Sequence, residues 1–342
     1  MRSVSPKILV TNWVHPEVVD YLGNHCEVVA NRSREEPFTR EQILEKGKDA
    51  VGIIAFMPDF VDEALLVRLP SVCVIACALK GYDNFDVEAC TRHGVWLTIV
   101  PDLLTVPTAE LTIGLMIGLA RKVLEGDRQI RSGRFLGWRP MLYGLGLAGS
   151  RVGIVGMGAV GQAVAQRLRG FDAELIYFDA RPLSESRERE LHLQRSVFDQ
   201  LLDVSDYVVL ALPLSEQSVD IIDERALSRM KRGSLLINPA RGSLVNEEAV
   251  ADALASGQLA GYAADVFEME DWARPDRRRG ISQRLLAERE RTLLTPHLGS
   301  AVDSVRRQIA MEAAHNVQQA VKGQRPRGAI NEPVERTRRV AS

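Results

Sequence analysis

One histidine in the sequence stands in a setting that suits acid–base chemistry. His297 follows an apolar run and is held between a proline and a glycine in the segment Thr-Pro-His-Leu-Gly-Ser, residues 295–300. An imidazole fixed in this way can move a proton near neutral pH, and a carboxylate bonded to it would set its tautomer. The other five histidines lie in polar or helical contexts and are expected to be surface or packing residues: His15, His25, His93, His192 and His315.

An arginine that follows another apolar run could bind an anion. Residues 234–237 lead into Asn-Pro-Ala-Arg-Gly, in which the arginine is Arg241. Ligands of parallel sheets bind beyond the carboxyl ends of the strands, and a guanidinium there can hold an oxyanion through two parallel hydrogen bonds. On this motif alone, a surface arginine in a turn is an equally good interpretation.

A glycine-rich turn predicts a dinucleotide site. A predicted strand ends at Gly156, and Gly158 and Gly161 complete the pattern Gly-x-Gly-x-x-Gly at the start of a predicted helix. Such a turn lets the backbone approach a pyrophosphate at a helix N-terminus. A second strand-like run ends in Asp179, which can bind both ribose hydroxyls and repel a 2′-phosphate. The expected cofactor contacts in this region are Gly156, Gly158, Ala159, Val160, Gly161 and Asp179.

The elements that must position these residues alternate along the chain. Strand-like apolar runs are separated by helical patterns, which predicts βαβ units and parallel sheets covered on both faces. Thr39 begins a capping box, and Asp62 precedes a predicted helix. Residues 125–149 are rich in Gly, Arg and aromatics, which suits an arm or a loop better than a core element. The strand-like runs are 7–10, 51–55, 72–76, 95–100, 152–155, 175–178, 207–212, 234–238 and 261–266.

Length, composition and charge indicate two domains and exclude some partners. The chain has 342 residues, of which 46% are hydrophobic and 26% charged, as is typical of a globular protein with a full core. Lysine and arginine number 43 against 45 acidic residues. This balance argues against a nucleic-acid partner bound through a large basic field. A small anionic substrate stays compatible, because one or two buried cations suffice for it.

The sequence predicts a cytoplasmic protein. No apolar stretch approaches the roughly 18–20 residues that span a bilayer, so no membrane partner is expected. The N-terminus runs straight into Lys7-Ile8-Leu9-Val10 without the apolar region of a signal peptide. The four cysteines contain no Cys-x-x-Cys pair, which disfavours a zinc site or a disulfide. We therefore expect reduced thiols and no metal.

The order of these motifs resembles the D-2-hydroxyacid dehydrogenase superfamily. The glycine pattern, the acid, Asn-Pro-Ala-Arg-Gly, Asp-Val-Phe-Glu-x-Glu and Thr-Pro-His-x-Gly follow one another, and the resemblance covers residues 7–331. It implies that Arg241 binds the substrate anion, Glu270 is the carboxylate partner of His297, and His297 is the acid/base. It also implies that Asp265 contacts the cofactor.

The same resemblance implies a fold and an assembly. The fold is α/β, with a Rossmann-type doubly wound parallel sheet inserted into a smaller flavodoxin-like substrate domain. The dinucleotide-binding domain is expected at 101–302 and the substrate domain at 1–100 plus 303–335. Members of the superfamily are usually dimers through the cofactor domain, so a homodimer is expected.

Several segments resemble, more narrowly, the phosphonate dehydrogenases of this superfamily, which oxidise phosphite to phosphate with NAD. Typical superfamily members carry a small or apolar residue where this chain has Lys80, in the segment 78–86. The resemblance implies that Lys80 joins Arg241 as a catalytic cation for phosphite, a small dianion near neutral pH. A solvated Lys80 is the alternative, which its apolar lead-in disfavours. The other segments that carry the resemblance are 55–59, 100–110, 137–140 and 267–272.

The closer resemblance also implies a substrate pocket. For the positions beyond Lys80, a packing role fits the sequence about as well as a functional one. Arg306 matches an arginine that supports the pocket from behind. The implied pocket residues are Met57, Lys80, Gly81, Leu104 and Ser300, with further matches at Trp138, Tyr143 and Trp272.

The implied reaction moves a hydride from the P–H bond to the nicotinamide while water attacks phosphorus. His297 accepts the proton of the water, Glu270 holds the imidazole, and Arg241 orients the phosphite. NAD is the expected cofactor. NADP is expected to work more weakly, because Arg181 can partly offset the charge of Asp179 towards a 2′-phosphate.

Three alternatives stay open on the sequence. The first is a D-2-hydroxyacid dehydrogenase of the glycerate or glyoxylate type, which would leave Lys80 unexplained. The second is an NAD-sensing corepressor-like binding protein, and the third a non-catalytic dinucleotide-binding scaffold. The basic loop 274–279 is expected to be a solvated face or, alternatively, a contact for cofactor phosphate or for substrate steering. Residues 336–339 are expected to form a tail.

Overall fold

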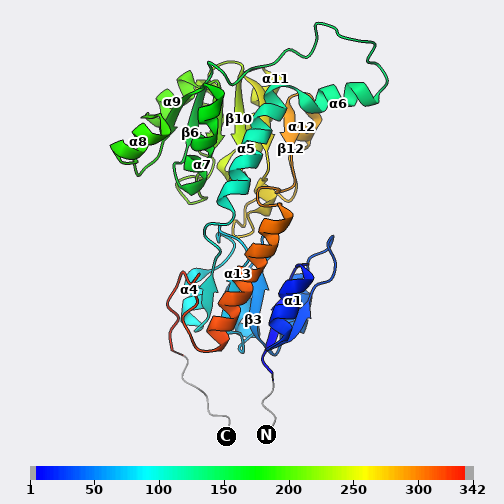
Figure 1. The fold of residues 1–342 in the computed structure, drawn as a ribbon, viewed down its shortest axis with the longest axis vertical. Coiled ribbons are helices and arrows are strands. Elements are labelled where there is room, and N and C mark those ends of the chain that lie inside the picture. The colour runs from blue at the N-terminus through cyan, green and yellow to red at the C-terminus, as the bar shows by residue number, and fades with distance from the viewer. Residues whose placement is uncertain (1–4, 336–342) are drawn as a thin grey trace. The chain divides into compact units, whose positions relative to one another are not determined.

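The polypeptide leaves one folded unit after Leu104 and returns to it at Val302 (Figure 1). In the computed structural model, which describes residues 5–335, unit 1 comprises Met1–Leu104 and Val302–Ser342, and unit 2 comprises Thr105–Ala301. Each unit is a parallel sheet covered by helices, so the expected α/β fold with one domain inserted into the other is confirmed. The tail expected at 336–339 lies outside the described residues.

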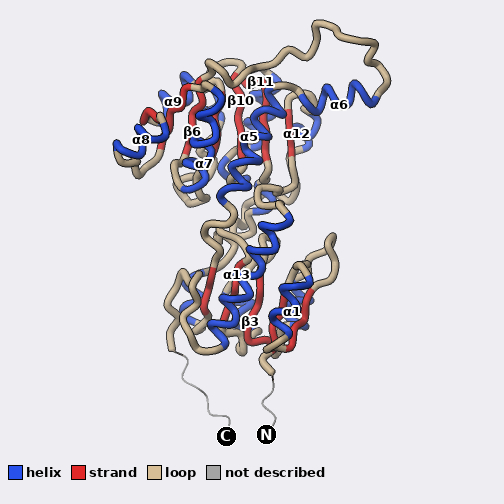
Figure 2. Tube along the Cα trace, in the orientation of Figure 1, coloured by secondary structure: helices blue, strands red, loops and turns tan. Residues whose placement is uncertain are grey.

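Unit 2 is built on seven parallel strands in the order β12-β11-β10-β9-β6-β7-β8. Figure 2 shows strands of this sheet in red, with β6, β10 and β11 labelled. The chain enters at β6, in the interior of the sheet, and proceeds to each edge in turn, which is the doubly wound arrangement. The strands are β6 (Arg151–Val155), β7 (Glu174–Phe178), β8 (Leu193–Arg195), β9 (Tyr207–Leu210), β10 (Ser234–Asn238), β11 (Leu259–Ala264) and β12 (Thr292–Leu294).

Helices cover both faces of the unit 2 sheet because alternate strand residues point to opposite sides. In β6, the fully buried Val152 and Ile154 belong to the core that includes residues of α5 and α7, whereas Val155 belongs to the core on the other face, which includes residues of α9, α10 and α11. The helices and short 3-10 turns are α5 (Thr105–Ala120), α6 (Val123–Arg131), α7 (Ala159–Leu168), η1 (Arg169–Phe171), α8 (Glu185–Leu191), α9 (Phe198–Val204), α10 (Glu224–Arg229), η2 (Gly242–Leu244), α11 (Glu247–Ala255), η3 (Glu268–Glu270) and α12 (Gln283–Ala287).

The strand register of unit 2 gathers the chemically interesting residues at one edge. Val155 of β6 pairs with Phe178 of β7, so the glycine turn and Asp179 emerge side by side. Asn238, at the end of β10, pairs with Ala264 of β11, and Ala264 pairs with Leu294 of β12. The three loops that follow these strands therefore begin next to one another at the carboxyl edge of the sheet.

Unit 1 is a five-stranded parallel sheet in the flavodoxin-like order β2-β1-β3-β4-β5. Helices α1 and α13 cover one face, and α2, α3 and α4 cover the other. On the first face, Ile309, Ala313 and Val317 of α13 are fully buried against the strands. The elements are β1 (Lys7–Val10), α1 (Pro16–Gly23), β2 (Glu27–Ala30), α2 (Arg40–Lys46), β3 (Ala50–Ala55), α3 (Glu63–Arg68), β4 (Val74–Cys77), α4 (Val87–Arg92), β5 (Trp96–Thr98) and α13 (Asp303–Val321).

The local signals read from the sequence hold in part. The capping box at Thr39 and the Asp62 cap are both formed. The arm expected at 125–149 is only partly irregular, because α6 occupies its start; Figure 1 shows α6 and the segment after it extending away from the unit 2 sheet. Within residues 5–335, no helix has the length and apolar character needed to cross a bilayer.

Candidate active site

The glycine turn after β6 combines two glycines that the fold requires with one that it does not. Gly156 has φ +97°, and a Cβ there would lie 2.6 Å from the backbone of Ala211. A Cβ at Gly161 would overlap the carbonyl oxygen of Gly156. At Gly158, which caps α7, a Cβ would meet nothing within 4 Å. The turn is thus tight on its inner side and open at Gly158, where a pyrophosphate could approach the N-terminus of α7.

Asp179 is tied to this turn by its carboxylate. Met157 donates its backbone N–H to Oδ2 at 2.6 Å, and Arg181 donates its backbone N–H to Oδ1 at 2.7 Å. The negative charge therefore lies beside the glycine turn, at the end of β7. These residues fit a bound dinucleotide, with the open turn for the phosphates and the carboxylate for a ribose.

The loop after β10 holds Arg241 against the loop after β11. The side chain of Asn238, fully buried, donates to the Arg241 carbonyl at 2.8 Å and accepts from the Ala240 N–H at 3.1 Å. A Cβ at Gly242 would overlap the backbone of Phe267, so only glycine allows the two loops to touch. Arg241 itself is half-buried and donates from Nη1 to the Ala240 carbonyl at 2.8 Å.

An imidazole–carboxylate pair lies in the next two loops. His297 Nδ1 is 2.7 Å from Glu270 Oε2, and the two side chains are 30% and 27% exposed. Glu270 Oε1 accepts the backbone N–H of Phe267 at 2.8 Å, so each carboxylate oxygen has a partner. A neutral imidazole that donates from Nδ1 leaves Nε2 able to accept a proton. This pairing agrees with the one that the sequence resemblance implies.

Asp265 fixes the backbone that carries the histidine. Its backbone carbonyl accepts the N–H of His297 at 2.8 Å, and its carboxylate accepts the N–H groups of Leu298 and Gly299, each at 2.7 Å. Burial raises the pKa of the Asp265 carboxyl, while the hydrogen bond from the Thr295 hydroxyl and those from the loop amides oppose that rise. His297 takes a left-handed φ of +55° in this loop, a conformation that a non-glycine residue holds only when its surroundings enforce it.

In unit 1, the residues expected to line a pocket follow the carboxyl ends of β3 and β4. Met57 follows β3, and Lys80 and Gly81 follow β4; all three are half-buried. The Asn84 side chain donates to the Met57 carbonyl at 3.3 Å. Arg306 of α13 lies behind these loops, donating to the Ala78 carbonyl at 3.4 Å.

Further unit 1 contacts complete this region. The Arg306 guanidinium lies 5.9 Å from the centre of the Phe56 ring, and burial lowers the pKa of Arg306. Leu104 packs at the margin of the core between the sheet and α13.

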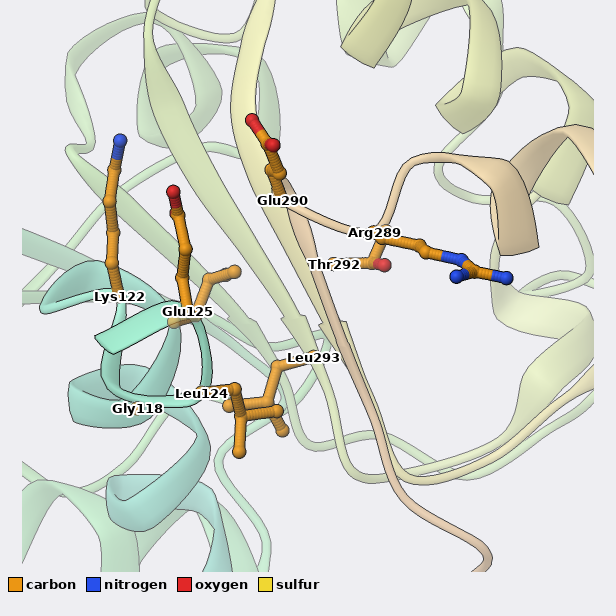
Figure 3. A pocket seen from close by; sticks show the side chains of 9 residues that line it. Gly118, Lys122, Leu124, Glu125, Arg289, Glu290, Thr292 and Leu293 are labelled. Atoms are coloured by element: carbon orange, nitrogen blue, oxygen red, sulfur yellow. The ribbon is translucent and has the colours of Figure 1, made fainter. Parts of the chain in front are cut away.

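Other residues expected near the substrate are exposed in unit 2. Trp138 and Tyr143, on the segment after α6, are 78% and 74% exposed, whereas Ser300 is half-buried beside the histidine loop. A small hollow between α5, α6 and β12 contains none of the expected site residues (Figure 3). It is lined by Gly118, Leu119, Lys122, Leu124, Glu125, Arg289, Glu290, Thr292 and Leu293.

Comparison with known proteins identifies the family. Residues 113–299, which lie within unit 2, match the D-isomer specific 2-hydroxyacid dehydrogenase, NAD binding domain. The chain belongs to that family. It is therefore an NAD-binding oxidoreductase of the D-2-hydroxyacid dehydrogenase type, and unit 2 is its NAD-binding domain.

Full-length relatives agree with this membership. The chain is 34% identical to a glyoxylate reductase of Pyrococcus furiosus, an alignment that covers 98% of each chain. It is 35% identical to a glyoxylate reductase of Pyrococcus horikoshii, over 98% of this chain and 99% of the relative. Among solved structures it resembles the TT0316 protein of Thermus thermophilus, with a TM-score of 0.86 and 32% identity over 95% of this chain and all of that one.

Sequence reasoning missed how the site residues of this dehydrogenase are held. It assigned Asp265 to the cofactor but not to the histidine loop. The expectation that the loop 274–279 is simply a solvated face is wrong for Arg277, which is only 8% exposed. The run of charges around Arg277 hid it, because a buried arginine and a solvated one look the same in a sequence.

Proposed function

We propose that this dehydrogenase oxidises a small oxyanion with NAD, and that the oxyanion is phosphite. The observation that carries the catalytic part is the 2.7 Å contact of His297 Nδ1 with Glu270 Oε2, next to the loop that bears Arg241. A base, its orienting carboxylate and a cation are the groups that proton removal from a bound anion requires.

The residues take the following parts in the proposed reaction. Bound NAD would supply the acceptor for the hydride, which leaves phosphorus with the electron pair of the P–H bond. A water oxygen forms the new P–O bond, and His297 Nε2 accepts the proton of that water. Glu270 holds the imidazole through Nδ1. Arg241 binds the oxyanion and stabilises the negative charge that develops on it in the transition state.

Lys80 supports phosphite as the substrate. Phosphite carries two negative charges near neutral pH and has no carbon chain, so its affinity must come from cations and hydrogen bonds. Arg241 supplies one positive charge, and Lys80 supplies a second. Lys80 follows a fully buried strand and is itself half-buried, which sets it apart from an ordinary surface lysine.

The comparisons favour a second candidate, a 2-hydroxy acid of the glyoxylate type. The relatives described above bear the name glyoxylate reductase, and Arg241, Glu270 and His297 suit that reaction equally well. In that case Arg241 binds the substrate carboxylate and His297 exchanges a proton with the hydroxyl oxygen. Lys80 then has no assigned part.

One assay separates the two candidates. Purified protein with NAD⁺ is scored for NADH against phosphite, glycolate, glycerate and lactate, and with NADH against glyoxylate. Phosphite-dependent NADH is expected, with a KM that rises in Lys80→Ala and a kcat that falls mainly in Arg241→Ala. Turnover of the hydroxy acids or of glyoxylate without phosphite turnover would establish the second candidate instead, and an unchanged KM in Lys80→Ala would remove that lysine from the site.

We also propose a preference for NAD over NADP, set by Asp179. Its charge beside the glycine turn opposes a 2′-phosphate, while Arg181 partly offsets it. Replacing Asp179 by Ala should raise the ratio of NADP⁺ to NAD⁺ kcat/KM by about 10-fold or more, because about 1.4 kcal/mol of relieved repulsion already gives that factor. It should also lower NAD⁺ efficiency, since the Met157 amide loses its acceptor. A parent that already prefers NADP⁺ would contradict this assignment.

A homodimer through unit 2 is the assembly we propose. Large apolar side chains are exposed to solvent on α6 and on the segment after it. In a globular protein, an apolar patch of this kind is normally covered by a partner. Replacing Leu136, 82% exposed, with Asp should shift sedimentation from dimer to monomer if a second copy covers this segment. The exposed side chains are Val123, Leu124, Ile130, Phe135, Leu136, Trp138, Met141, Tyr143 and Leu145.

We also propose a cytoplasmic location. The feature that favours it is the presence of four free thiols, three of them buried.

A further inference from the structure

The segment that presents Glu270 to His297 is short and has little regular structure to hold it. Glu270 ends the three-residue turn η3, which lies in the loop after β11. One of its carboxylate oxygens is used by Phe267 and the other faces His297. The orientation of the carboxylate therefore depends on what fixes the residues around it, among them Met269 before it and Trp272 two positions after it.

Arg277 contacts both of these residues. Its Nε donates to the Met269 carbonyl at 3.3 Å, and its guanidinium carbon lies 4.3 Å from the centre of the Trp272 ring. Its Nη1 donates to the Arg274 carbonyl at 3.1 Å, which ties the guanidinium to its own loop as well. One side chain thus spans the residue before Glu270 and the residue two positions after it.

Arg277 differs from the other arginines of its loop. Arg274 pairs with Asp276 at 2.9 Å, Arg278 pairs with Glu248 at 2.9 Å, and Arg279 is exposed. Arg277 is buried, and this desolvation lowers the pKa of its guanidinium. The contact of this guanidinium with the ring of Trp272, which is 41% exposed, adds a cation–π interaction to its hydrogen bonds.

We propose that Arg277 is a positioning residue that holds Glu270 in register with His297. The proposal rests on the pairing of Glu270 with His297 in the proposed function. A planar guanidinium is needed, because its fork donates in the plane while its face stacks on the indole. Lysine offers neither feature. The run of charges in the loop 274–279 indicates a solvated surface. One residue of this loop, Arg277, nevertheless supports the catalytic carboxylate.

The test compares Arg277→Ala, Arg277→Lys and Glu270→Gln with Arg279→Ala, an exposed arginine of the same loop. Ring ¹⁵N spectra of His297, assigned with His297→Asn, report whether the imidazole holds a single Nδ1–H tautomer, and they require no substrate. The pH dependence of kcat/KM is measured with whichever substrate the parent turns over. NAD⁺ affinity and Tm are measured for every variant.

We expect Arg277→Ala and Arg277→Lys to lose the single tautomer, as Glu270→Gln does. Their kcat should fall by on the order of 10- to 100-fold, the usual effect of displacing a catalytic group slightly. In the direction of substrate oxidation, where His297 acts as the base, the acidic limb of the profile should move to lower pH, because a displaced carboxylate no longer stabilises the imidazolium. NAD⁺ affinity should stay within about two-fold, and Arg279→Ala should match the parent throughout.

The proposal would be overturned if Arg277→Ala folds and keeps both the single tautomer of His297 and the acidic limb of the parent. If Glu270→Gln alters these two readouts in the same experiment, the proposed function still stands. If Glu270→Gln changes neither readout, the pairing itself fails and the proposal with it. Should Arg277→Ala not fold, Trp272→Leu decides, because it removes the ring from a partly exposed site and leaves the arginine. We expect Trp272→Leu to give the same changes in smaller size, and no change there would equally overturn the proposal.

Discussion

His297 is held in a backbone conformation that costs free energy, on the order of 1–3 kcal/mol. The Asp265 carbonyl and carboxylate receive three consecutive amides of its loop, which enforces the left-handed φ. The loop is thus fixed before any ligand arrives. An imidazole that needs no reorganisation during the reaction is the form of base that catalysis favours.

Replacing His297 by Ala should greatly lower turnover and leave NAD⁺ binding intact. We expect kcat to fall by about 10²–10⁴-fold, the usual contribution of a positioned acid–base group, with NAD⁺ affinity unchanged because the glycine turn is untouched. Stopped-flow kinetics and a fluorescence titration with NAD⁺ measure the two effects. Turnover within a few-fold of the parent would remove His297 from the mechanism.

Asp59 gives the protein a pH-dependent stability that is independent of the catalytic residues. The carboxyl is buried in the loop after β3, where its Oδ2 accepts hydrogen bonds from the Thr11 hydroxyl at 2.5 Å and the Phe56 N–H at 2.7 Å. Burial raises its pKa from 3.8 to about 6, against the effect of both hydrogen bonds. The folded state therefore binds this proton more tightly than the unfolded state. Its contribution is largest below the unfolded value of 3.8 and is lost as pH rises to about 6.

Asp59→Asn should remove that pH dependence while keeping an acceptor for both donors. The free energy of unfolding of the parent minus that of the variant should fall between about pH 4 and pH 7 by up to about 3 kcal/mol, since two pKa units correspond to that amount. Urea unfolding at several pH values measures the difference. A difference that stays constant, or rises with pH, would show that the carboxyl is not buried in this way.

Among the elements, the glycine turn allows binding to be separated from folding. Gly158→Ala adds a methyl group to open space at the start of α7, so the free energy of unfolding should change by about 1 kcal/mol or less. NAD⁺ affinity should nevertheless fall about 10-fold or more, because the methyl group occupies the approach of the pyrophosphate. Calorimetric titration and thermal unfolding give the two values.

Gly161→Ala is the matched control for this turn. Its methyl group would overlap the Gly156 carbonyl oxygen, so this variant should lose several degrees in Tm as well as NAD⁺ affinity. A Gly158→Ala variant that binds NAD⁺ as the parent does would place the pyrophosphate elsewhere.

The central strands were predictable from the sequence, as was the edge strand β5, whereas the edge strands β2, β8 and β12 were not. β1, β6, β7 and β10 are buried on both faces, so they read as continuous apolar runs. β2, β8 and β12 lie at or next to the ends of their sheets, span three or four residues, and leave at least one residue partly exposed. Such strands form by pairing with a neighbour that a local pattern does not reveal.

The site shows the same division between local and distant information. The motifs, through the family resemblance that they carry, predicted the roles proposed for Arg241, Glu270 and His297, each of which follows its own strand at the carboxyl edge. Their supports were hidden for two different reasons. Asp265 holds residues more than thirty positions away, whereas Arg277 lies only eight positions from Met269 but stands in a run of charged residues.

For the molecule as a whole, the fold of unit 1 depends on a helix that the chain reaches only after unit 2. The buried side chains of α13 pack directly on the strands of the unit 1 sheet. A chain that ends at Ala301 should therefore keep a folded NAD-binding unit 2 and leave unit 1 open. NAD⁺ binding, together with proteolysis confined to residues 1–104, would show this. Equal resistance of that segment in both chains would indicate that α13 is dispensable.

The position of α13 also orders events during synthesis. The first five strands leave the ribosome early, but α13, which with α1 covers one face of their sheet, follows about two hundred residues later. At a translation rate of about 5–20 residues per second, this apolar face stays incompletely covered for on the order of ten seconds or more before α13 is synthesised. During that interval unit 2 can complete its own sheet, since every strand of that sheet lies between the two halves of unit 1. The nascent protein should thus engage a holding chaperone through residues 1–104 and release it when α13 emerges.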